Sequence, residues 1–317
     1  MPEGRLNRPL YYNEVGVTMT TRPEYGFGNI PEEYKSYHNA AVAIVPVSYD
    51  ETATWKKGSR YGPNAIIEAS GHLELYDIET DSEVYLEGIY TDHPIKESGL
   101  PEDLIREVRT RVATHLAHNK FVVCLGGEHS ISIGTVQAYA KKYEDLSVLQ
   151  LDAHADLQDE YNGSRYNHNC VMARVLECCD IVQVGIRSMD HVETGKIKKG
   201  TVFFADAIMN GGDWIGDIVN KLSENVYITI DLDVFDLSIM PATGTPEPGG
   251  LNWHQVTSLL KKVTEMRSVV GFDVVELCPS EYSYPQDYLV AKLIYKLLSY
   301  IYKEDQNGKK RYTEYTH

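Results

Sequence analysis

The chain has 317 residues, of which 43% are hydrophobic, and a formal net charge of −16 at pH 7. Such an acidic chain is unsuited to binding nucleic acid or an anionic membrane surface, and both are excluded as expected partners. Its five cysteines include no CxxC pair, and neither a signal peptide nor a bilayer-spanning stretch is apparent, so we expect a cytoplasmic protein without a disulfide framework.

The predicted elements alternate between strands and helices after an irregular start. Residues 1–40 are polar with interspersed Tyr, Pro and Gly, and we expect them to form an arm lying on the domain or on a neighbouring subunit. Short β-branched runs predict strands at 41–47, 121–125, 147–151, 181–186, 201–205, 226–232 and 268–277. Helical patterns lie between them, at 63–70, 101–118, 129–143, 169–177, 212–223, 252–265 and 286–302. This alternation predicts an α/β fold with a parallel sheet covered on both faces.

The chain shows no sign of a division into separate domains. It has neither an internal repeat nor a Pro/Ser-rich linker, so we expect one domain over residues 1–317, with a charged tail at 303–317.

Potential metal ligands follow three of the predicted strands. The segment 149–156 reads LQLDAHAD, and alternation along an extended chain points three of its side chains to one side: Asp152, His154 and Asp156. Asp231 and Asp233 repeat this device in the segment ITIDLDVFD, and His129 follows strand 121–125 and two glycines. Ligands of parallel α/β sheets bind outside the carboxyl ends of the strands, which is where all these residues lie.

Two imidazoles and four carboxylates are more ligands than one ion needs. They suit two ions that share bridging carboxylates, and their oxygen-rich character favours manganese over zinc. Two such ions can generate a hydroxide at neutral pH. Turn or helix capping explains any one of these residues, but it does not explain the whole set.

The motifs GGEHS (126–130), DAHAD (152–156) and DLDVFD (231–236), followed by ATGTPEPGG (242–250), resemble the ureohydrolase family of arginases, agmatinases, guanidinobutyrases and formiminoglutamases. The resemblance spans about residues 40–300. It implies a three-layer α/β/α domain with a mostly parallel, eight-stranded sheet. It also implies two Mn²⁺ per subunit, whose bridging hydroxide attacks a guanidinium carbon.

The resemblance also assigns roles to single residues. His129 and Asp156 would hold one manganese, His154 and Asp233 the other, and Asp152 and Asp231 would bridge both. Asp156 would also accept a hydrogen bond from the hydroxide. Glu276 would grip the guanidinium through paired hydrogen bonds, and Thr245 would hydrogen-bond near it or serve its turn. His168, in a mobile loop, would pass a proton to the leaving amine or from solvent.

Three positions depart from the family pattern without removing a metal ligand. Thr229 stands where Ser is usual and keeps the hydroxyl, Leu237 stands where Pro is usual, and Asn169 replaces a frequent Gly.

The loop 157–167, LQDEYNGSRYN, bears on the choice of substrate. It lacks the arginase pattern for holding an α-carboxylate, and Asp159 and Glu160 would repel one. Arg165 favours the opposite interpretation, because a guanidinium in this loop could bind a carboxylate. We expect a small cationic guanidino substrate, foremost agmatine, hydrolysed to putrescine and urea in polyamine biosynthesis.

Several alternatives stay open from the sequence. The chain could be a guanidinobutyrase, an arginase or a formiminoglutamase, or a non-catalytic homologue that acts as a binding subunit. A metal-dependent deacetylase would share the architecture but normally holds one zinc with fewer carboxylates. The resemblance further implies a homo-oligomer, either a trimer or a hexamer.

Overall fold

The computed structural model describes residues 26–96, 99–280 and 284–303. Most of the expected N-terminal arm, and all of the expected tail except residue 303, therefore lie outside the described residues. Between residues 26 and 40 the chain is irregular apart from the 3-10 turn η1 (Glu32–Tyr34).

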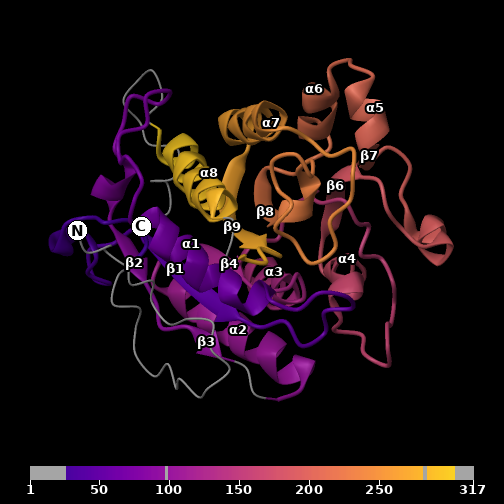
Figure 1. Cartoon of the computed structure of the whole chain (residues 1–317), viewed down its shortest axis with the longest axis horizontal. Coiled ribbons are helices and arrows are strands. Elements are labelled where there is room, and N and C mark those ends of the chain that lie inside the picture. Colours follow the sequence, from indigo (N-terminus) through magenta and orange to yellow (C-terminus); the bar gives the residue numbers. More distant parts are fainter. Residues whose placement is uncertain (1–25, 97–98, 281–283, 304–317) are drawn as a thin grey trace, which may run out of the picture.

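A parallel sheet crosses the centre of the molecule, flanked by helices (Figure 1). Every strand pair in it is parallel. The order along the sheet is β2 (Ile89–Thr91), β1 (Val42–Ser48), β4 (Phe121–Gly126), β9 (Ser268–Val275), β8 (Asn225–Asp231), β5 (Leu146–Leu151), β6 (Asp180–Ile186) and β7 (Val202–Phe204). The expectation of an α/β fold with a mostly parallel sheet is confirmed.

In the described part of the chain the sheet has nine strands rather than the expected eight, because one edge is interrupted. β3 (Ile95–Lys96) pairs with residues 47 and 48 of β1, while β2 pairs with residues 42–44 of the same strand. β4 occupies the other side of β1. β2 and β3 therefore lie one after the other along a single edge, and the sheet has eight positions filled by nine strands. Both strands are too short to give a recognisable sequence pattern.

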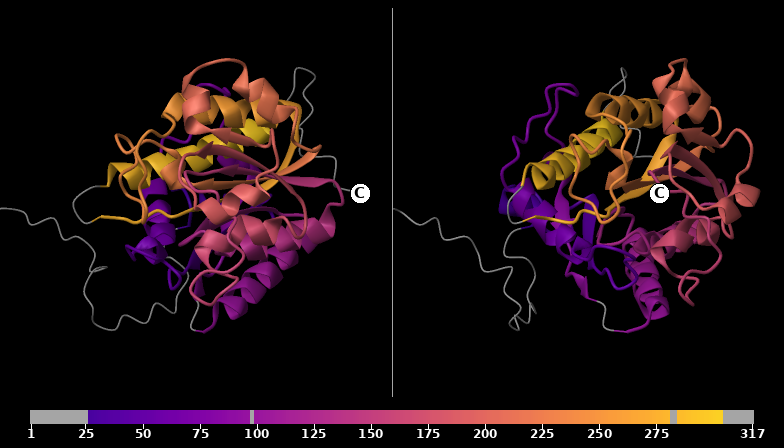
Figure 2. Two further views of the ribbon diagram at one scale, coloured as in Figure 1. Left: turned by 90° about the vertical axis from the view of Figure 1, so that its right-hand side faces the viewer. Right: turned by 45° about the vertical axis from the view of Figure 1, so that its right-hand side comes forward.

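Side chains of each strand alternate between two hydrophobic clusters, one on each face of the sheet. In β1, Val42 and Ile44 join the first cluster and Val45 and Val47 the second. Figures 1 and 2 show the helices in two layers. The first cluster includes side chains of α1 (Gly62–Ser70), α6 (Trp214–Val219), α7 (Trp253–Met266) and α8 (Pro285–Tyr302). The second includes side chains of α2 (Pro101–Ala117), α3 (Ile131–Lys142) and α4 (Val171–Val175).

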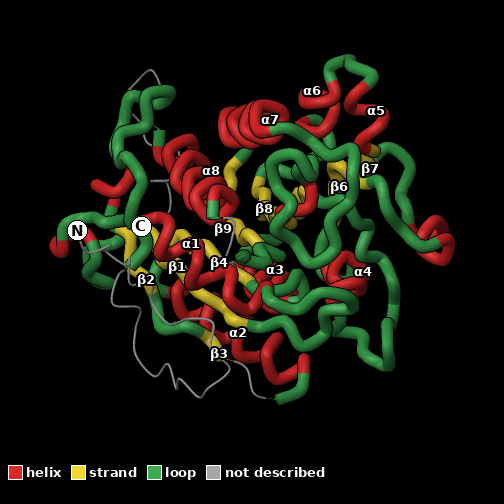
Figure 3. The backbone as a smooth tube through the Cα atoms, viewed as in Figure 1, coloured by secondary structure: helices red, strands yellow, loops and turns green. Residues whose placement is uncertain are grey.

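Two predicted elements differ in detail from the structure. The run 201–205, expected as a strand, ends as one at Phe204, and Ala205 already begins the short helix α5 (Ala205–Met209). The helix expected at 169–177 is split into the 3-10 turn η4 (His168–Cys170) and α4. No helix in the described part of the chain is long and apolar enough to cross a membrane. Long loops connect the elements on the side where the strands end (Figure 3).

Candidate metal centre

Four neighbouring strands in the middle of the sheet deliver the predicted site residues. β4, β9, β8 and β5 lie side by side in this order, and their carboxyl ends share one edge because the sheet is parallel. His129 follows β4, Glu276 follows β9, Asp231 ends β8 and Asp152 follows β5. Residues far apart in the sequence are therefore brought to one place by strand order.

The six predicted ligands form one cluster, in which His154 is half-buried and the other five are buried. His129, Asp152 and Asp156 offer ligand atoms within 4.8 Å of one another, and so do Asp152, His154 and Asp233. Asp152 belongs to both groups, which is the geometry required of a bridging carboxylate. Asp231 adjoins the first group, with its Oδ2 3.5 Å from Nδ1 of His129. The structure thus brings together all six residues that the sequence singles out.

The orientation of the His129 ring tests whether these residues fit a metal. Thr229 donates its hydroxyl proton to Oδ1 of Asp273 at 2.6 Å, so its oxygen accepts the Nε2 proton of His129 at 2.9 Å. In its neutral form the ring carries its lone pair on Nδ1, which lies 3.1 Å from Asp152 Oδ2 and 3.0 Å from Asp156 Oδ2. This buried Nδ1 has no hydrogen-bond partner among the described residues. Burial alone would lower the pKa of His129, but Asp152 and Asp156 raise it well above its ordinary value, so a proton occupies this place unless a metal ion does. The donor set therefore fits a metal ion.

Crowding of negative charge gives the cluster its electrostatic character. Burial and the charge of Asp152 raise the pKa of Asp156 to about 7. Burial and the charge of Asp233 raise the pKa of Asp231 well above its ordinary range. Burial alone would lower the pKa of His154, but Asp233 and Asp152 raise it to about 12. A centre that holds protons this tightly without a cation would release them to divalent ions.

Asp156 and Glu276 adopt an unusual backbone conformation. Their φ angles are +54° and +68°, in the left-handed region that non-glycine residues rarely occupy. Such strain is concentrated at functional sites, where the surrounding structure enforces it. Oε1 of Glu276 accepts the backbone N–H of His129 at 2.8 Å, and burial and the nearby Glu128 raise the pKa of Glu276 well above its usual range. A buried carboxyl group whose pKa is raised in this way is stabilised in its ionised form by a cation, so it is suited to pair with a guanidinium group.

His168 lies beside the centre, held by the loop that follows β1. Its Nδ1 lies 3.3 Å from Thr52 Oγ1 and its Nε2 lies 3.3 Å from Thr54 Oγ1. Burial and the charges of His129 and His154 lower the pKa of His168 to about 4, so the ring is neutral at physiological pH.

Thr245 is the predicted site residue with the weakest structural connection. It is half-buried, and among the described residues no hydrogen bond joins it to Glu276. A side-chain carbon built on its neighbour Gly244 would be 3.5 Å from Glu276 Oε2. The predicted role of Thr245 near the guanidinium stays a prediction.

The loop 157–167 presents its charges differently from the expectation. Asp159 is exposed and forms ion pairs with Lys196 at 2.7 Å and Arg174 at 3.3 Å, so its charge is compensated. Arg165, the one cation of this loop, pairs with Glu177 at 2.8 Å. The structure therefore weakens two arguments at once: repulsion by Asp159 and capture of a carboxylate by Arg165.

Further polar residues support the ligands without having been predicted. Gln150 donates to Asp152 Oδ2 at 2.6 Å and is itself held by Gln183 Nε2 at 2.6 Å. Both glutamines are buried in strands, and a polar residue inside an apolar strand was the sequence signal that could have revealed them.

Arg187 holds two functional loops together. Its Nη2 donates to the carbonyl oxygens of Asp233 at 2.5 Å and Glu247 at 2.9 Å, and its Nε donates to that of Pro248 at 3.0 Å. One guanidinium thereby fixes the turn that carries Asp233, a candidate metal ligand, against the loop 243–248.

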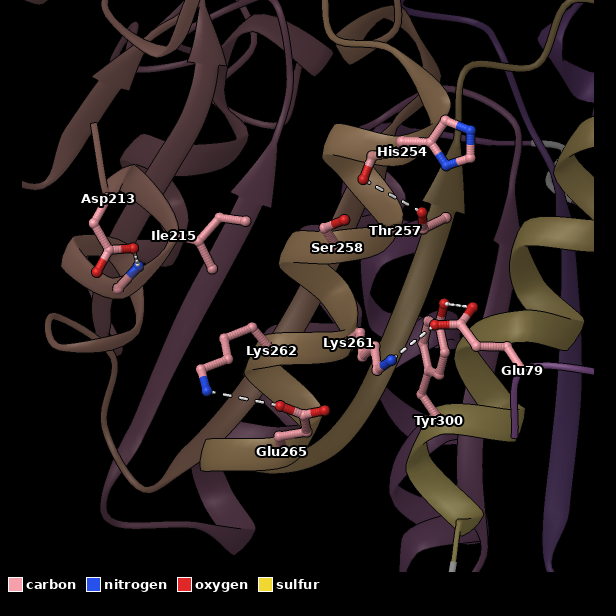
Figure 4. A pocket seen from close by; sticks show the side chains of 11 residues that line it. Glu79, Asp213, Ile215, His254, Thr257, Ser258, Lys261, Lys262, Glu265 and Tyr300 are labelled. Atoms are coloured by element: carbon pink, nitrogen blue, oxygen red, sulfur yellow. Dashed lines mark hydrogen bonds and ion pairs between the residues drawn. The ribbon is translucent and has the colours of Figure 1, made fainter. Parts of the chain in front are cut away.

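A separate hollow of about 460 Å³ lies between α6 and α7 (Figure 4). Four of its charged side chains form ion pairs: Lys261 with Glu79 at 2.9 Å, and Lys262 with Glu265 at 3.7 Å. Burial alone would raise the pKa of Glu79, but Lys296 and Lys261 lower it to about 2. These pairs hold surface elements together, and the lining lacks the clustered ligands of the metal centre.

Comparison with known proteins gives a consistent result. The family model described as "Arginase family" matches residues 40–299. The chain is 38% identical over 280 residues to the N(1)-aminopropylagmatine ureohydrolase of Synechocystis sp., covering 85% of this chain and 92% of that protein. It is 33% identical over 269 residues to the agmatinase of Pyrococcus horikoshii, covering 82% and 92% of the two chains. The crystal structure of the agmatine ureohydrolase of Thermoplasma volcanium superimposes with a TM-score of 0.77 at 31% identity, covering 84% and 91%.

Proposed function

The chain belongs to the arginase family, and we propose that it is a binuclear manganese enzyme that hydrolyses the guanidino group of an agmatine-type amine, releasing urea. The observation that carries this proposal is the joint placement of six metal ligands and the Glu276 carboxylate at the ends of four adjacent strands.

The residues divide the work between metal binding and substrate binding. His129 and Asp156 would hold one ion, His154 and Asp233 the other, with Asp152 and Asp231 between them. When bound, the metal pair supplies a nucleophile derived from water at neutral pH. Oxygen-rich ligation favours manganese.

The protein's own side chains orient the substrate and handle protons. Glu276 pairs with the planar guanidinium cation, which places the guanidinium carbon beside the metal ligands because Glu276 is itself hydrogen-bonded to the backbone of His129. His168 exchanges a proton with the leaving amine, and Thr52 and Thr54 hold its ring in place.

The substrate is best identified as an amine without a carboxylate. Arg165 forms an exposed ion pair with Glu177, so the carboxylate of an amino-acid substrate would have to compete with Glu177 for the one cation of the loop 157–167. The carboxylate of Glu247, 3.8 Å from His154 Nε2 and partly exposed, adds negative charge beside the centre and favours a polycation. Relatives at 38% and 39% identity are named N(1)-aminopropylagmatine ureohydrolases, against 33% for an agmatinase. This difference favours N(1)-aminopropylagmatine as substrate, with agmatine second.

A substrate panel tests the proposal. The manganese-loaded protein is assayed with N(1)-aminopropylagmatine, agmatine, arginine, 4-guanidinobutyrate and formiminoglutamate, while urea and formamide are both measured. We expect urea from the two amines. Formamide from formiminoglutamate would identify the chain as a formiminoglutamase, and no turnover of any compound would favour a non-catalytic binding subunit.

A variant of one ligand tests the metal requirement. Asp231→Ala is expected to lower urea release more than about 100-fold, beyond the usual effect of residues that only support a ligand, and to lower bound manganese. Asp217→Ala, an exposed residue of α6, is the matched control. Parent-like turnover by Asp231→Ala would refute the binuclear assignment.

We also propose that the chain assembles as a trimer or hexamer, as the family resemblance implies. Light scattering coupled to gel filtration, performed on the full chain, measures this directly; a monomer would contradict it.

A further inference from the structure

We propose that Thr52 is a positioning residue for His168: its hydroxyl, held by the buried Glu128 carboxylate, fixes which ring nitrogen of His168 carries a proton. The inference rests on the proposed function for its catalytic meaning, but the geometry stands by itself. Thr52 Oγ1 contacts both the backbone N–H of His168, at 3.2 Å, and the ring Nδ1, at 3.3 Å. One hydroxyl therefore holds both the backbone and the side chain of this residue.

Glu128 and Asp50 hold Thr52 in place. Glu128 is fully buried and accepts the Thr52 backbone N–H at 2.8 Å and the Thr52 hydroxyl at 2.5 Å. Asp50, also fully buried, accepts the Gly58 N–H at 2.8 Å and Nε of Arg60 at 2.5 Å. These contacts close the loop 50–58 on itself, so Thr52 projects from a rigid base.

The hydrogen bonds determine the tautomer of His168. A threonine hydroxyl has one proton, and Thr52 donates it to Oε1 of Glu128. With Glu128 as a carboxylate, the Thr52 oxygen can act toward His168 only as an acceptor. The neutral imidazole must therefore carry its proton on Nδ1, which leaves Nε2 as the atom that can take up and return a proton.

This arrangement matters because the tautomer decides from which atom a proton is transferred. Without the Thr52 hydroxyl, the ring is free to place its proton on Nε2, where it would block proton uptake at that atom. Thr54, 3.3 Å from Nε2, is compatible with either state because its hydroxyl can donate or accept. Thr52 thus acts through His168 and does not touch the reacting atoms.

A double-mutant cycle tests the proposal with Thr52→Val, Thr52→Ser, His168→Ala and the double variant Thr52→Val/His168→Ala. Urea release from the manganese-loaded full chain gives kcat and KM, and bound manganese is measured in each sample. We expect Thr52→Val to lower kcat by about 10–100-fold, with KM and bound manganese within about twofold of the parent. Thr52→Ser, which keeps the hydroxyl, is expected to restore most of the rate.

The coupling between the two positions is the decisive quantity. If Thr52 acts through His168, Thr52→Val changes the rate of the His168→Ala protein by less than about twofold. The control Thr110→Val removes an equivalent hydroxyl from the exposed face of α2, and no change is expected. Three results would overturn the inference. They are an equal loss of rate from Thr52→Val in the parent and in the His168→Ala protein, a Thr52→Ser protein as slow as Thr52→Val, and an unchanged kcat in Thr52→Val.

A measurement independent of turnover separates this inference from the proposed function. Imidazole ¹⁵N chemical shifts of the histidine-labelled protein report the His168 tautomer, and the signal missing from His168→Ala identifies the residue. We expect the Nδ1-protonated form in the parent and in Thr52→Ser, and a shift toward the Nε2-protonated form in Thr52→Val. The same tautomer in parent and Thr52→Val would refute the positioning role, whether or not the parent releases urea.

Discussion

Replacing Thr229 with valine removes one hydroxyl from the support of a proposed metal ligand, His129, while nearly preserving side-chain shape. In the folded chain this hydroxyl accepts the Nε2 proton of His129 at 2.9 Å and donates to Asp273 Oδ1 at 2.6 Å. All three residues are buried. After the substitution, no water can easily replace the lost partner, so His129 Nε2 and Asp273 Oδ1 each lose a hydrogen bond.

The size of the effect follows from these two lost contacts. Asp273 keeps two other donors, because the hydroxyls of Tyr227 and Thr135 lie 2.7 Å and 3.3 Å from its Oδ2, so its loss is partial. His129 loses the partner that fixes its ring. Loss of such a partner typically lowers metal affinity 10–100-fold, which corresponds to about 1.4–2.7 kcal/mol. An unpaired buried polar group also costs about 1–3 kcal/mol of folding free energy.

Chelator-buffered manganese titrations measure the affinity, and urea unfolding at saturating manganese measures the stability. Thr229→Ser keeps the hydroxyl and serves as the matched control. A Thr229→Val protein that binds manganese as tightly as the parent would refute the assigned ring orientation of His129. Equal losses in the serine and valine variants would show that the methyl group, not the hydroxyl, matters.

Three further predictions concern other parts of the chain. Gly127→Ala places a carbon 1.9 Å from the Tyr49 carbonyl oxygen and should lower the free energy of unfolding, measured with urea, by about 3 kcal/mol. Gly195→Ala, which has open space around it, should lower it far less, and an equal loss in the two variants would contradict this reasoning. The folded-state pKa of Glu79 is about 2, below its ordinary value of 4.5, so its stabilising contribution is present above pH 4.5 and is lost as the pH falls toward 2. Glu79→Gln should therefore have a lower free energy of unfolding than the parent at pH 7. This difference should shrink in acid. The kcat/KM of Glu276→Gln should fall by an amount equivalent to about 2–5 kcal/mol of transition-state stabilisation, with manganese content unchanged. A parent-like kcat/KM would exclude Glu276 from guanidinium binding.

The sequence predicted the strands that carry the ligands because their chemistry is local. Asp152, His154 and Asp156 alternate along a few residues, so their common direction follows from the geometry of an extended chain. The runs before His129 and Asp231 were equally clear, and the corresponding strands, β4 and β8, begin and end within one residue of the prediction.

Strand order and long-range pairs could not be predicted, because they depend on tertiary contacts. Nothing in the local sequence states that β9 lies between β4 and β8, or that Thr52 reaches a residue 116 positions away. The pairing of Arg165 with Glu177 was equally hidden, and it changed the interpretation of the substrate loop. The strand predicted at 201–205 is present but shorter, as Val202–Phe204, because the chain already turns into α5 at Ala205.

The position of β9 in the sheet has a consequence for the order in which a growing chain can mature. The six ligands all precede residue 234, yet β9, residues 268–275, is the strand that joins β4 to β8. Until β9 is synthesised, the sheet can exist only as two parts, β2-β1-β4 with His129 and β8-β5-β6-β7 with the aspartates and His154. A nascent chain would therefore carry every candidate ligand before β9 appears: Asp152, His154 and Asp233 could already lie together, but His129 could join Asp152 and Asp156 only after β9 has left the ribosome.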